Sequence, residues 1–207
     1  PPIFAKVIST LSRGEEVFIN VCDPVMEAEA RNILKQHDAL NNNVNFFHHP
    51  SDEPWCRDHG PIFVKNETTR AIINWDYNAW GKKYSPYEND NEIPTRIALA
   101  RGLGCHTPGM VLEGGSIEVN GQGTLLTTES CLLNSNRNPN LTKRDIEQRL
   151  RENLGVTNIL WLGNGIVGDD TDGHIDDLTR FVNEHTVVTA VEEDESDENH
   201  QPLWENL

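Results

Sequence analysis

Gly168-Asp169-Asp170-Thr171-Asp172-Gly173-His174-Ile175-Asp176-Asp177 is the stretch around which this chain is organised. It places five carboxylates and one imidazole within ten residues, a density that neither a core nor an ordinary turn requires. Two other short polar clusters precede it, at residues 55–61 and 112–115. We expect the three clusters to occupy equivalent places in a repeated fold and to converge on one site.

The segments that follow the clusters support such a repeat. After each cluster comes an apolar strand that ends in Asn, then a turn and a second apolar strand. Asp58, Glu113 and His174 follow one another at nearly equal spacing, with a period of roughly 60 residues, which is longer than that of the common solenoid repeats. Each unit combines helix, strand, cluster and hairpin. The sequence therefore predicts an α/β fold whose modules each present one cluster toward a shared axis.

Hydrophobic periodicity and turn residues place the helices and strands around the clusters. Helices are predicted at residues 1–12, 24–40, 93–103 and 142–154, single strands at 16–21, 44–47 and 159–162, and hairpins at 62–75, 116–127 and 178–191. The first two strands are expected to be parallel, because a helix lies between them. Residues 76–91 are predicted to form a long aromatic loop of functional importance. Residues 192–198 are expected to be a solvated acidic loop.

Charge and cysteine content limit the function classes. The net charge of −16 disfavours nucleic acid, because phosphate binding needs a basic surface. The negative charge favours a cationic ligand only weakly, because an acidic composition more often serves solubility alone. No apolar run is long enough to cross a bilayer, so no membrane span is expected. The four cysteines form no C-x-x-C pair, which predicts reduced thiols in a cytoplasmic protein. We expect no cofactor and no metal, and a homo-oligomer is left open.

The clusters offer a limited chemistry by themselves. Carboxylates that are distant in sequence suit a guanidinium, whose planar N–H groups take bidentate partners. A histidine two residues from an aspartate can act as general acid/base beside a bound cation. No nucleophile able to break a C–N bond at a guanidinium carbon is among them. The candidate side chains are Asp58, Glu113, His174 and Asp176, with Asp169 and Asp172 nearby.

Other interpretations of the same residues stay open at this point. Carboxylates and an imidazole in an Asp-x-x-x-His-x-Asp pattern could ligate Mn, Zn or Fe. The stretch 168–177, taken alone, could also be an acidic turn. Arg57 is expected to donate a structural ion pair. Cys56 is expected to be passive, because the neighbouring acidic residues raise a thiol pKa.

At these clusters the sequence resembles a known family. The motifs W-x-R-D-x-G-P at 55–61, L-E-G-G-S at 112–116 and D-G-H-I-D at 172–176, with N-S-N-R-N-P at 134–139, are similar to those of agmatine deiminases in the bacterial-type peptidyl-arginine deiminase family. The resemblance covers nearly the whole chain. It implies a pentein α/β propeller of five ββαβ-type modules, of which about three would be present in one incomplete catalytic domain, residues 1–207. The approximate modules are expected at 1–75, 76–130 and 131–191.

The resemblance also implies a reaction, the conversion of agmatine to N-carbamoylputrescine and ammonia in putrescine (polyamine) biosynthesis. Asp58 and Asp176 resemble the carboxylates that hold the guanidinium nitrogens. Glu113 resembles the carboxylate that binds substrate and helps to shuttle protons. His174 resembles the general acid/base that protonates the leaving ammonia and activates water.

The remaining site residues and the nucleophile follow from the same resemblance. Trp55 and Asp172 complete the expected substrate-binding set. The family's nucleophile is a cysteine in a Gly-rich motif near the C-terminus, a motif that this chain lacks, so we expect the nucleophile outside residues 1–207. A peptidyl-arginine deiminase, a guanidine-binding pentein without chemistry and a metal-dependent hydrolase are the alternatives. Three acidic residues are left without a role: Asp169, Asp170 and Asp177.

Overall fold

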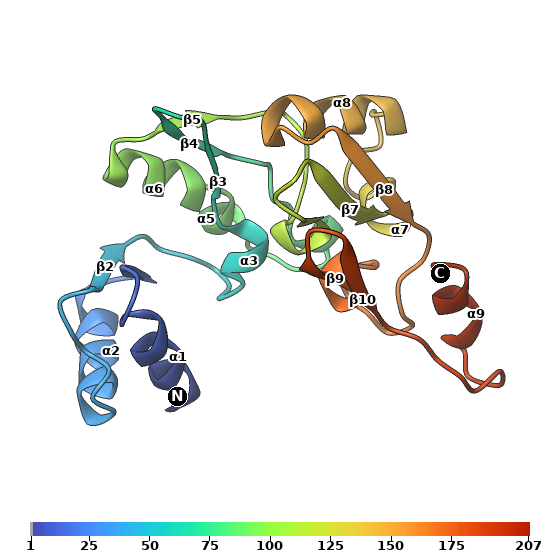
Figure 1. Ribbon diagram of the computed structural model, residues 1–207. Helices are drawn as coiled ribbons and strands as arrows, with labels where there is room; N and C mark the ends of the chain where they lie inside the picture. Colours follow the sequence, from blue (N-terminus) through green and yellow to red (C-terminus); the bar gives the residue numbers. More distant parts are fainter. Residues whose placement is uncertain (1) are drawn as a thin grey trace. The chain divides into compact units, whose positions relative to one another are not determined.

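The chain divides into two compact units, Pro1–Pro54 and Trp55–Leu207. The structure is a computed structural model that describes residues 2–207 (Figure 1). Both units mix helices with strands. The three polar clusters all belong to the second unit, so the candidate site can be described within one body.

The first unit pairs two helices with a small parallel sheet. Its elements are α1 (Pro2–Leu11), β1 (Val17–Val21), α2 (Pro24–Gln36) and β2 (Val44–His48). The predicted parallel pairing of β1 with β2 is confirmed. Asp23 caps α2 by accepting a hydrogen bond from the Met26 amide, and Pro24 occupies the first turn, as its fixed φ allows. The helix ends four residues before the predicted boundary, and Asp38 beyond it has a left-handed φ of 50°.

The second unit contains two three-stranded sheets of identical topology. In each sheet an antiparallel hairpin is extended by a third strand, which pairs in parallel with the second strand of the hairpin. A helix precedes this third strand in the sequence. One sheet comprises β3 (Ile62–Lys65), β4 (Arg70–Ile73) and β5 (Gly104–His106), with α6 (Ile93–Arg101) before β5. The other comprises β6 (Glu118–Val119), β7 (Thr124–Thr128) and β8 (Asn158–Leu162), with α8 (Lys143–Leu154) before β8. This shared topology supports the predicted repeat.

Short helical turns form at the three clusters. They are α3 (Cys56–His59), η1 (Gly114–Ser116) and η2 (Ile175–Asp177). η1 packs against both α3 and η2, which brings the clusters together. The remaining elements are α4 (Ala79–Lys82), α5 (Glu88–Asn91), α7 (Glu129–Leu132), the hairpin of β9 (Thr179–Asn183) with β10 (Thr186–Thr189), and α9 (His200–Trp204).

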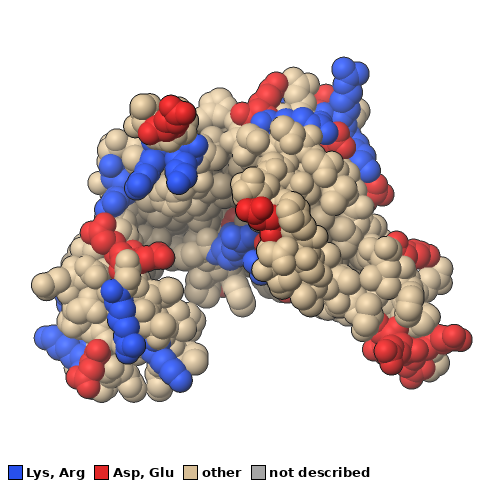
Figure 2. All heavy atoms as spheres, in the orientation of Figure 1, with Lys and Arg blue, Asp and Glu red and all other residues tan. Residues whose placement is uncertain are grey.

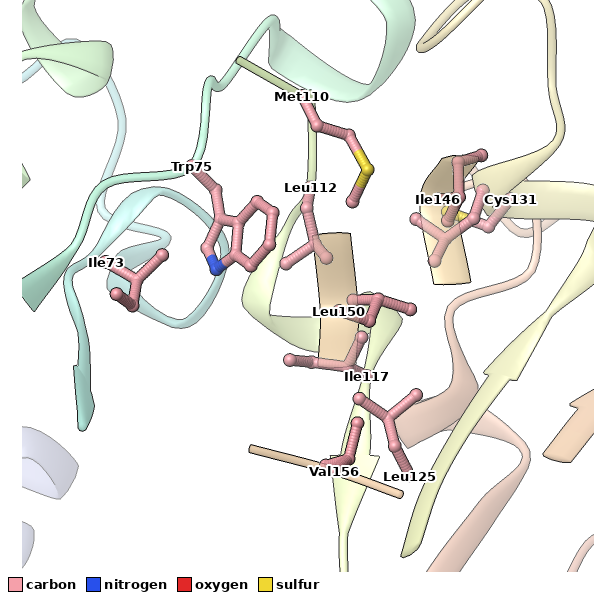
Figure 3. Packing of buried hydrophobic residues seen from close by; sticks show 11 residues of the cluster. Ile73, Trp75, Met110, Leu112, Ile117, Leu125, Cys131, Ile146, Leu150 and Val156 are labelled. Atoms are coloured by element: carbon pink, nitrogen blue, oxygen red, sulfur yellow. The ribbon is translucent and has the colours of Figure 1, made fainter. Parts of the chain in front are cut away.

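The main core lies between α8 and the sheet strands of the second unit. α8 contributes Ile146 and Leu150, which face the same side of a helix at i and i+4. Leu112 and Ile117, on either side of η1, point into the same core (Figure 3), so η1 is anchored by burial. The other buried members of this cluster are Ile73, Trp75, Met110, Leu125, Cys131, Leu132 and Val156.

Local signals define the ends of α8 as the sequence predicts. Thr142 accepts a hydrogen bond from the Asp145 amide, and Asp145 accepts one from the Thr142 amide, which completes a capping box. Gly155 closes the helix with a left-handed φ of 68°. These caps orient α8 over the core that supports η1.

The acidic tract at residues 192–198 is mostly exposed, as predicted. Figure 2 shows Asp and Glu side chains gathered on this segment, which follows β10. Among residues 2–207, none of the helices has both the length and the apolar character that spanning a membrane requires.

Candidate active site

Gly115 lies at the point where the three clusters meet. A Cβ built on it would lie 2.6 Å from His174 Nδ1, 2.7 Å from Asp58 Oδ1 and 3.0 Å from Asp176 Oδ2. Distances this short exclude any side chain, so glycine allows the three groups to crowd around one backbone position. A Cβ on the neighbouring Gly114 would collide with the carbonyl oxygen of Arg57. The structure thus brings together side chains from the first and the third cluster, which are far apart in the sequence.

Asp58, in α3, is held by two hydrogen bonds. The Gly115 amide donates to Oδ1 at 3.0 Å, and Trp80 Nε1 donates to Oδ2 at 3.1 Å. The carboxylate is 10% exposed. Because each carboxyl oxygen accepts one hydrogen bond, the orientation of the Asp58 side chain is fixed.

Two carboxyl groups, those of Asp58 and Asp176, lie near the Nδ1 atom of His174. Its Nδ1 is 3.6 Å from Asp58 Oδ1 and 3.9 Å from Asp176 Oδ1, both longer than a hydrogen bond. Its Nε2 is buried and has no hydrogen-bond partner within the part of the chain that the structure describes. The imidazole is therefore close to two carboxyl groups without a hydrogen bond to either, which suits a group that transfers protons.

Asp169 organises the backbone that leads to His174. It accepts hydrogen bonds from the Thr171 amide at 2.8 Å, from Thr171 Oγ1 at 2.6 Å and from the Gly173 amide at 2.7 Å. Burial raises the pKa of Asp169, but these hydrogen bonds outweigh it and hold the pKa below its usual range. Thr128 Oγ1 also donates to the Gly173 carbonyl at 2.6 Å. Asp169, which the sequence left without a role, fixes the loop that presents the imidazole.

The folded structure raises the pKa of both Asp176 and Asp177, so it disfavours their ionised forms. Burial raises the pKa of Asp176, and the nearby Asp177 and Asp58 raise it further, while His174 partly lowers it. Burial likewise raises the pKa of Asp177, together with the charges of Asp169 and Asp58. A bound cation would relieve this repulsion, because an opposite charge stabilises the ionised carboxylate.

Glu113 is fully buried and pairs with the guanidinium of Arg137. Arg137 Nε donates to its Oε1 at 2.9 Å, and both side chains are 0% exposed. Its Oε2 is buried without a hydrogen-bond partner within residues 2–207. One oxygen of this carboxylate is thus fixed by the protein and the other is left for a ligand or a proton.

Asp172 is occupied by internal partners. Lys83 Nζ contacts Oδ1 at 2.6 Å, and Asn136 Nδ2 and Arg137 Nη1 both donate to Oδ2. Burial alone raises the pKa of Asp172, but these partners outweigh it and lower the pKa below its usual value. The substrate contact predicted for Asp172 stays a prediction.

Trp80 contacts the cluster through its hydrogen bond to Asp58. The sequence leaves open whether Trp80, together with Trp75 and Tyr77, helps to line the site or belongs to the core. Trp55, at the start of α3, is 57% exposed, and its predicted contact with substrate stays a prediction. Residues 79–82 have φ values of 52°, 54°, 85° and 66°, a left-handed turn that costs L-residues energy. Asn78 Oδ1 accepts a hydrogen bond from the Gly81 amide at 2.9 Å and stabilises this turn. The strained backbone presents Trp80 to Asp58.

Cys131 lies beside the cluster, although the sequence offers no sign of this. Donor atoms of Glu113, Cys131 and His174 lie within 4.8 Å of one another and could hold a divalent metal. Burial and the Glu113 carboxylate raise the pKa of the Cys131 thiol well above its ordinary value. Burial raises the pKa of Cys56 and of Cys105 as well. A neutral thiol is a poor metal ligand and a poor nucleophile, which favours a packing role for Cys131 within the core cluster to which it belongs.

Comparison with known sequences agrees with the motifs. The family model of the Porphyromonas-type peptidyl-arginine deiminases matches residues 1–207. The chain belongs to this family. The predicted family relationship is therefore confirmed.

Individual relatives show how far the likeness extends. The agmatine deiminase of Pseudomonas fluorescens (strain SBW25) is 45% identical over 164 residues, which cover 76% of this chain and 45% of the relative. A substrate-bound cysteine-to-serine variant of C. jejuni agmatine deiminase matches with a TM-score of 0.85 and 33% identity, over 98% of this chain and 59% of that one. An Enterococcus faecalis agmatine deiminase matches with a TM-score of 0.84 and 32% identity, over 98% and 55%.

These comparisons confirm the predicted mixed α/β fold as that of the agmatine deiminases, which are penteins. The chain spans roughly half of the length of the relatives that it matches, between 45% and 59% in these three cases. The number of propeller modules stays a prediction.

Proposed function

We propose that this protein hydrolyses agmatine to N-carbamoylputrescine and ammonia, and that residues 55–207 supply its substrate carboxylates and its acid/base group. The observation that carries the proposal is the convergence of Asp58, Asp176 and His174 around Gly115. The family relationship, and the relatives named agmatine deiminase, support agmatine as the substrate. A cytoplasmic location and a homo-oligomer belong to the same proposal.

The two aspartates suit a guanidinium ion. A guanidinium presents N–H groups in a planar fork, and carboxylates on two sides of it can accept them in pairs. The raised pKa of Asp176 fits this role, because the bound cation favours the ionised form that the empty site disfavours. Substrate binding and ionisation of Asp176 are then coupled.

His174 carries the proton transfers. In the proposed sequence, a thiolate attacks the guanidinium carbon, the C–N bond breaks, and ammonia leaves with a proton supplied by the imidazole. A water molecule then gives a proton back to the imidazole and attacks the amidino-thioether carbon. The hydroxyl group added by this water then loses its proton to solvent as the C–S bond breaks, which releases N-carbamoylputrescine and the thiolate. One water is consumed, and one ammonium ion is formed, for each agmatine.

We propose that the nucleophilic cysteine lies outside residues 1–207. The raised pKa values of Cys56, Cys105 and Cys131 speak against these thiols as nucleophiles. The C. jejuni structure, a cysteine-to-serine variant of agmatine deiminase with substrate bound, shows that substrate binding by that enzyme does not need this cysteine.

We also infer that residues 1–75, 76–130 and 131–191 are successive pentein modules within one incomplete catalytic domain, residues 1–207. The identical topology of the β3–β4–β5 and β6–β7–β8 sheets supports a repeat, although each sheet crosses a boundary between two of these proposed modules. Each module contributes one cluster to the site: Asp58 from the first, Glu113 from the second and His174 from the third.

The proposal is tested with the natural protein that contains this chain. Incubation with agmatine should release ammonia and give N-carbamoylputrescine, identified by NMR. A second candidate, peptidyl-arginine deimination, is favoured by the family description and is tested with an arginine-containing peptide. Agmatine binding in a calorimeter without ammonia release would instead indicate a guanidine-binding module. Activity that is lost on treatment with a chelator and restored by a divalent ion would favour a metal-dependent hydrolase.

A further inference from the structure

Arg137 is a buried guanidinium to which the proposed mechanism assigns no step. Its side chain is 0% exposed. Nε donates to Glu113 Oε1 at 2.9 Å, Nη2 donates to the Thr171 carbonyl at 2.9 Å, and Nη1 donates to Asn136 Oδ1 at 2.9 Å and to Asp172 Oδ2. All three nitrogens therefore have partners, as a buried charge requires.

These partners belong to two different clusters. Glu113 precedes η1, whereas Thr171 and Asp172 lie in the loop that leads to His174. Burial alone lowers the pKa of Arg137, but the Glu113 and Asp172 carboxylates outweigh it and raise the pKa, so the side chain remains a cation. Arg137 is thus a fixed, charged connection between the second and third clusters.

The contact also decides which oxygen of Glu113 is free. Oε1 is held by Arg137, while Oε2 is buried and has no hydrogen-bond partner among the described residues. A carboxylate oxygen of Glu113 lies within 4.8 Å of a ring nitrogen of His174. Holding one oxygen fixes the plane of the carboxylate and therefore the direction in which Oε2 points.

The charges around Arg137 form an ordered series. Arg137 lies between Glu113 and Asp172, and Asp172 is in turn paired with Lys83 at 2.6 Å. Glu113 is fully buried, whereas Asp172 is 22% and Lys83 29% exposed. The series therefore extends from the buried Glu113 carboxylate to the solvent. Replacing Arg137 by Lys would keep its positive charge but would remove the planar fork of N–H donors that contacts both carboxylates.

We propose that Arg137 is a positioning residue, which fixes Glu113 with Oε2 free and holds the loop of His174 at a set distance from it. The inference rests on the proposed agmatine deimination. Arg137 contributes to turnover through Glu113 and makes no contact with the reacting guanidinium.

The test is a double-mutant cycle of Arg137→Lys and Glu113→Gln, with agmatine turnover by the natural protein. Arg137→Lys should lower kcat by about 100-fold, the loss expected from misplacing a catalytic group by about 1 Å, with KM changed by less than about threefold. In the Glu113→Gln background the same change should lower kcat by less than about threefold, because residues that act as a unit are not additive. A residue with a purely structural role would give additive losses.

Arg180→Lys is the matched control. Arg180 Nε pairs with Glu118 at 3.0 Å in the same unit, outside the site, so this variant should keep the wild-type kcat. If Arg137→Lys fails to fold, Asn136→Ser serves instead. It removes one acceptor of Nη1 and should lower kcat by about fivefold in the wild-type background, with no further loss in the Glu113→Gln background.

The outcomes separate the inference from the function on which it rests. A wild-type protein that does not turn over agmatine overturns the proposed function and, with it, the inference. An active wild type with normal turnover in Arg137→Lys, or with additive losses in the cycle, overturns the inference alone.

Discussion

A methyl group added at Gly115 is the perturbation with the most direct effect on the site. The Cβ of Gly115→Ala would lie 2.6 Å from His174 Nδ1, 2.7 Å from Asp58 Oδ1 and 3.0 Å from Asp176 Oδ2. Since ordinary Cβ contacts lie beyond 3.4 Å, the imidazole has to retreat by about 0.8 Å and the Asp58 carboxylate by about 0.7 Å. A displacement of about 1 Å in a catalytic group costs about 100-fold in rate, whereas overpacking costs about 1–3 kcal/mol in stability.

The assay is kcat and KM for ammonia release from agmatine, with thermal unfolding of the same samples. We expect kcat of Gly115→Ala to fall by about 100-fold, with Tm lowered by several degrees. Gly104→Ala is the matched control, because among the described residues the nearest atom to its added Cβ would be the Ala71 Cβ, at 4.0 Å. This variant should keep the wild-type kcat. A Gly115→Ala variant whose kcat stays within about threefold of wild type would refute the crowding of these three groups.

Three further substitutions test separate parts of the structure. Trp80→Phe removes the donor to Asp58 Oδ2 and should raise KM for agmatine about tenfold, equivalent to about 1.4 kcal/mol; an unchanged KM would show that this hydrogen bond does not prepare the carboxylate. Asp176→Asn should abolish turnover yet increase the free energy of unfolding at pH 7 by up to about 1 kcal/mol, measured by denaturant titration. The sign follows from the raised pKa of Asp176: the folded state opposes its ionisation, so the gain is present at pH 7 and disappears below the ordinary pKa of 3.8. A less stable variant at pH 7 would contradict this. Thr142→Ala removes the cap of α8 and should lower Tm by about 2–4 °C, about 1 kcal/mol, without changing kcat; an equal Tm would show that the capping box does not stabilise the helix.

Local signals explain why much of the fold could be predicted from the sequence. Asp23-Pro24, the Thr142 capping box and Gly155 are helix boundaries that depend on residues within one turn, and the structure confirms them. The parallel pairing of β1 with β2 follows from the helix between them. The end of α2 was placed too late, because the sequence 37–40 contains no Gly or Pro to indicate where the helix stops.

Features that depend on distant contacts could not be predicted in this way. β5 has only three residues, Gly104–His106, and no apolar alternation, so its pairing with β4 decides its conformation. The left-handed turn at residues 79–82 has three non-glycine residues at positive φ, which no propensity favours. Arg137 is distant in sequence from both Glu113 and Asp172. The sequence therefore showed the motif that contains Arg137 but could not predict its ion pairs.

The candidate site was predictable as a set of residue types but not as a geometry. The motifs indicated Asp58, Glu113, His174 and Asp176, and the structure brings Asp58, His174 and Asp176 around Gly115. The supporting contacts of Trp80 and Asp169 emerge only from hydrogen bonds that the fold creates. Their roles in turnover are predictions that the variants above test.

Turnover and binding by His174→Ala, measured side by side in the natural protein, test the central claim most directly. If the imidazole is the acid/base and the carboxylates hold the guanidinium, ammonia release should fall by at least about 100-fold, since general acid–base catalysis contributes about 10²–10⁴-fold. Calorimetry should still detect agmatine binding, because Asp58 and Asp176 remain. A variant that releases ammonia at a rate close to that of the wild type would contradict the account.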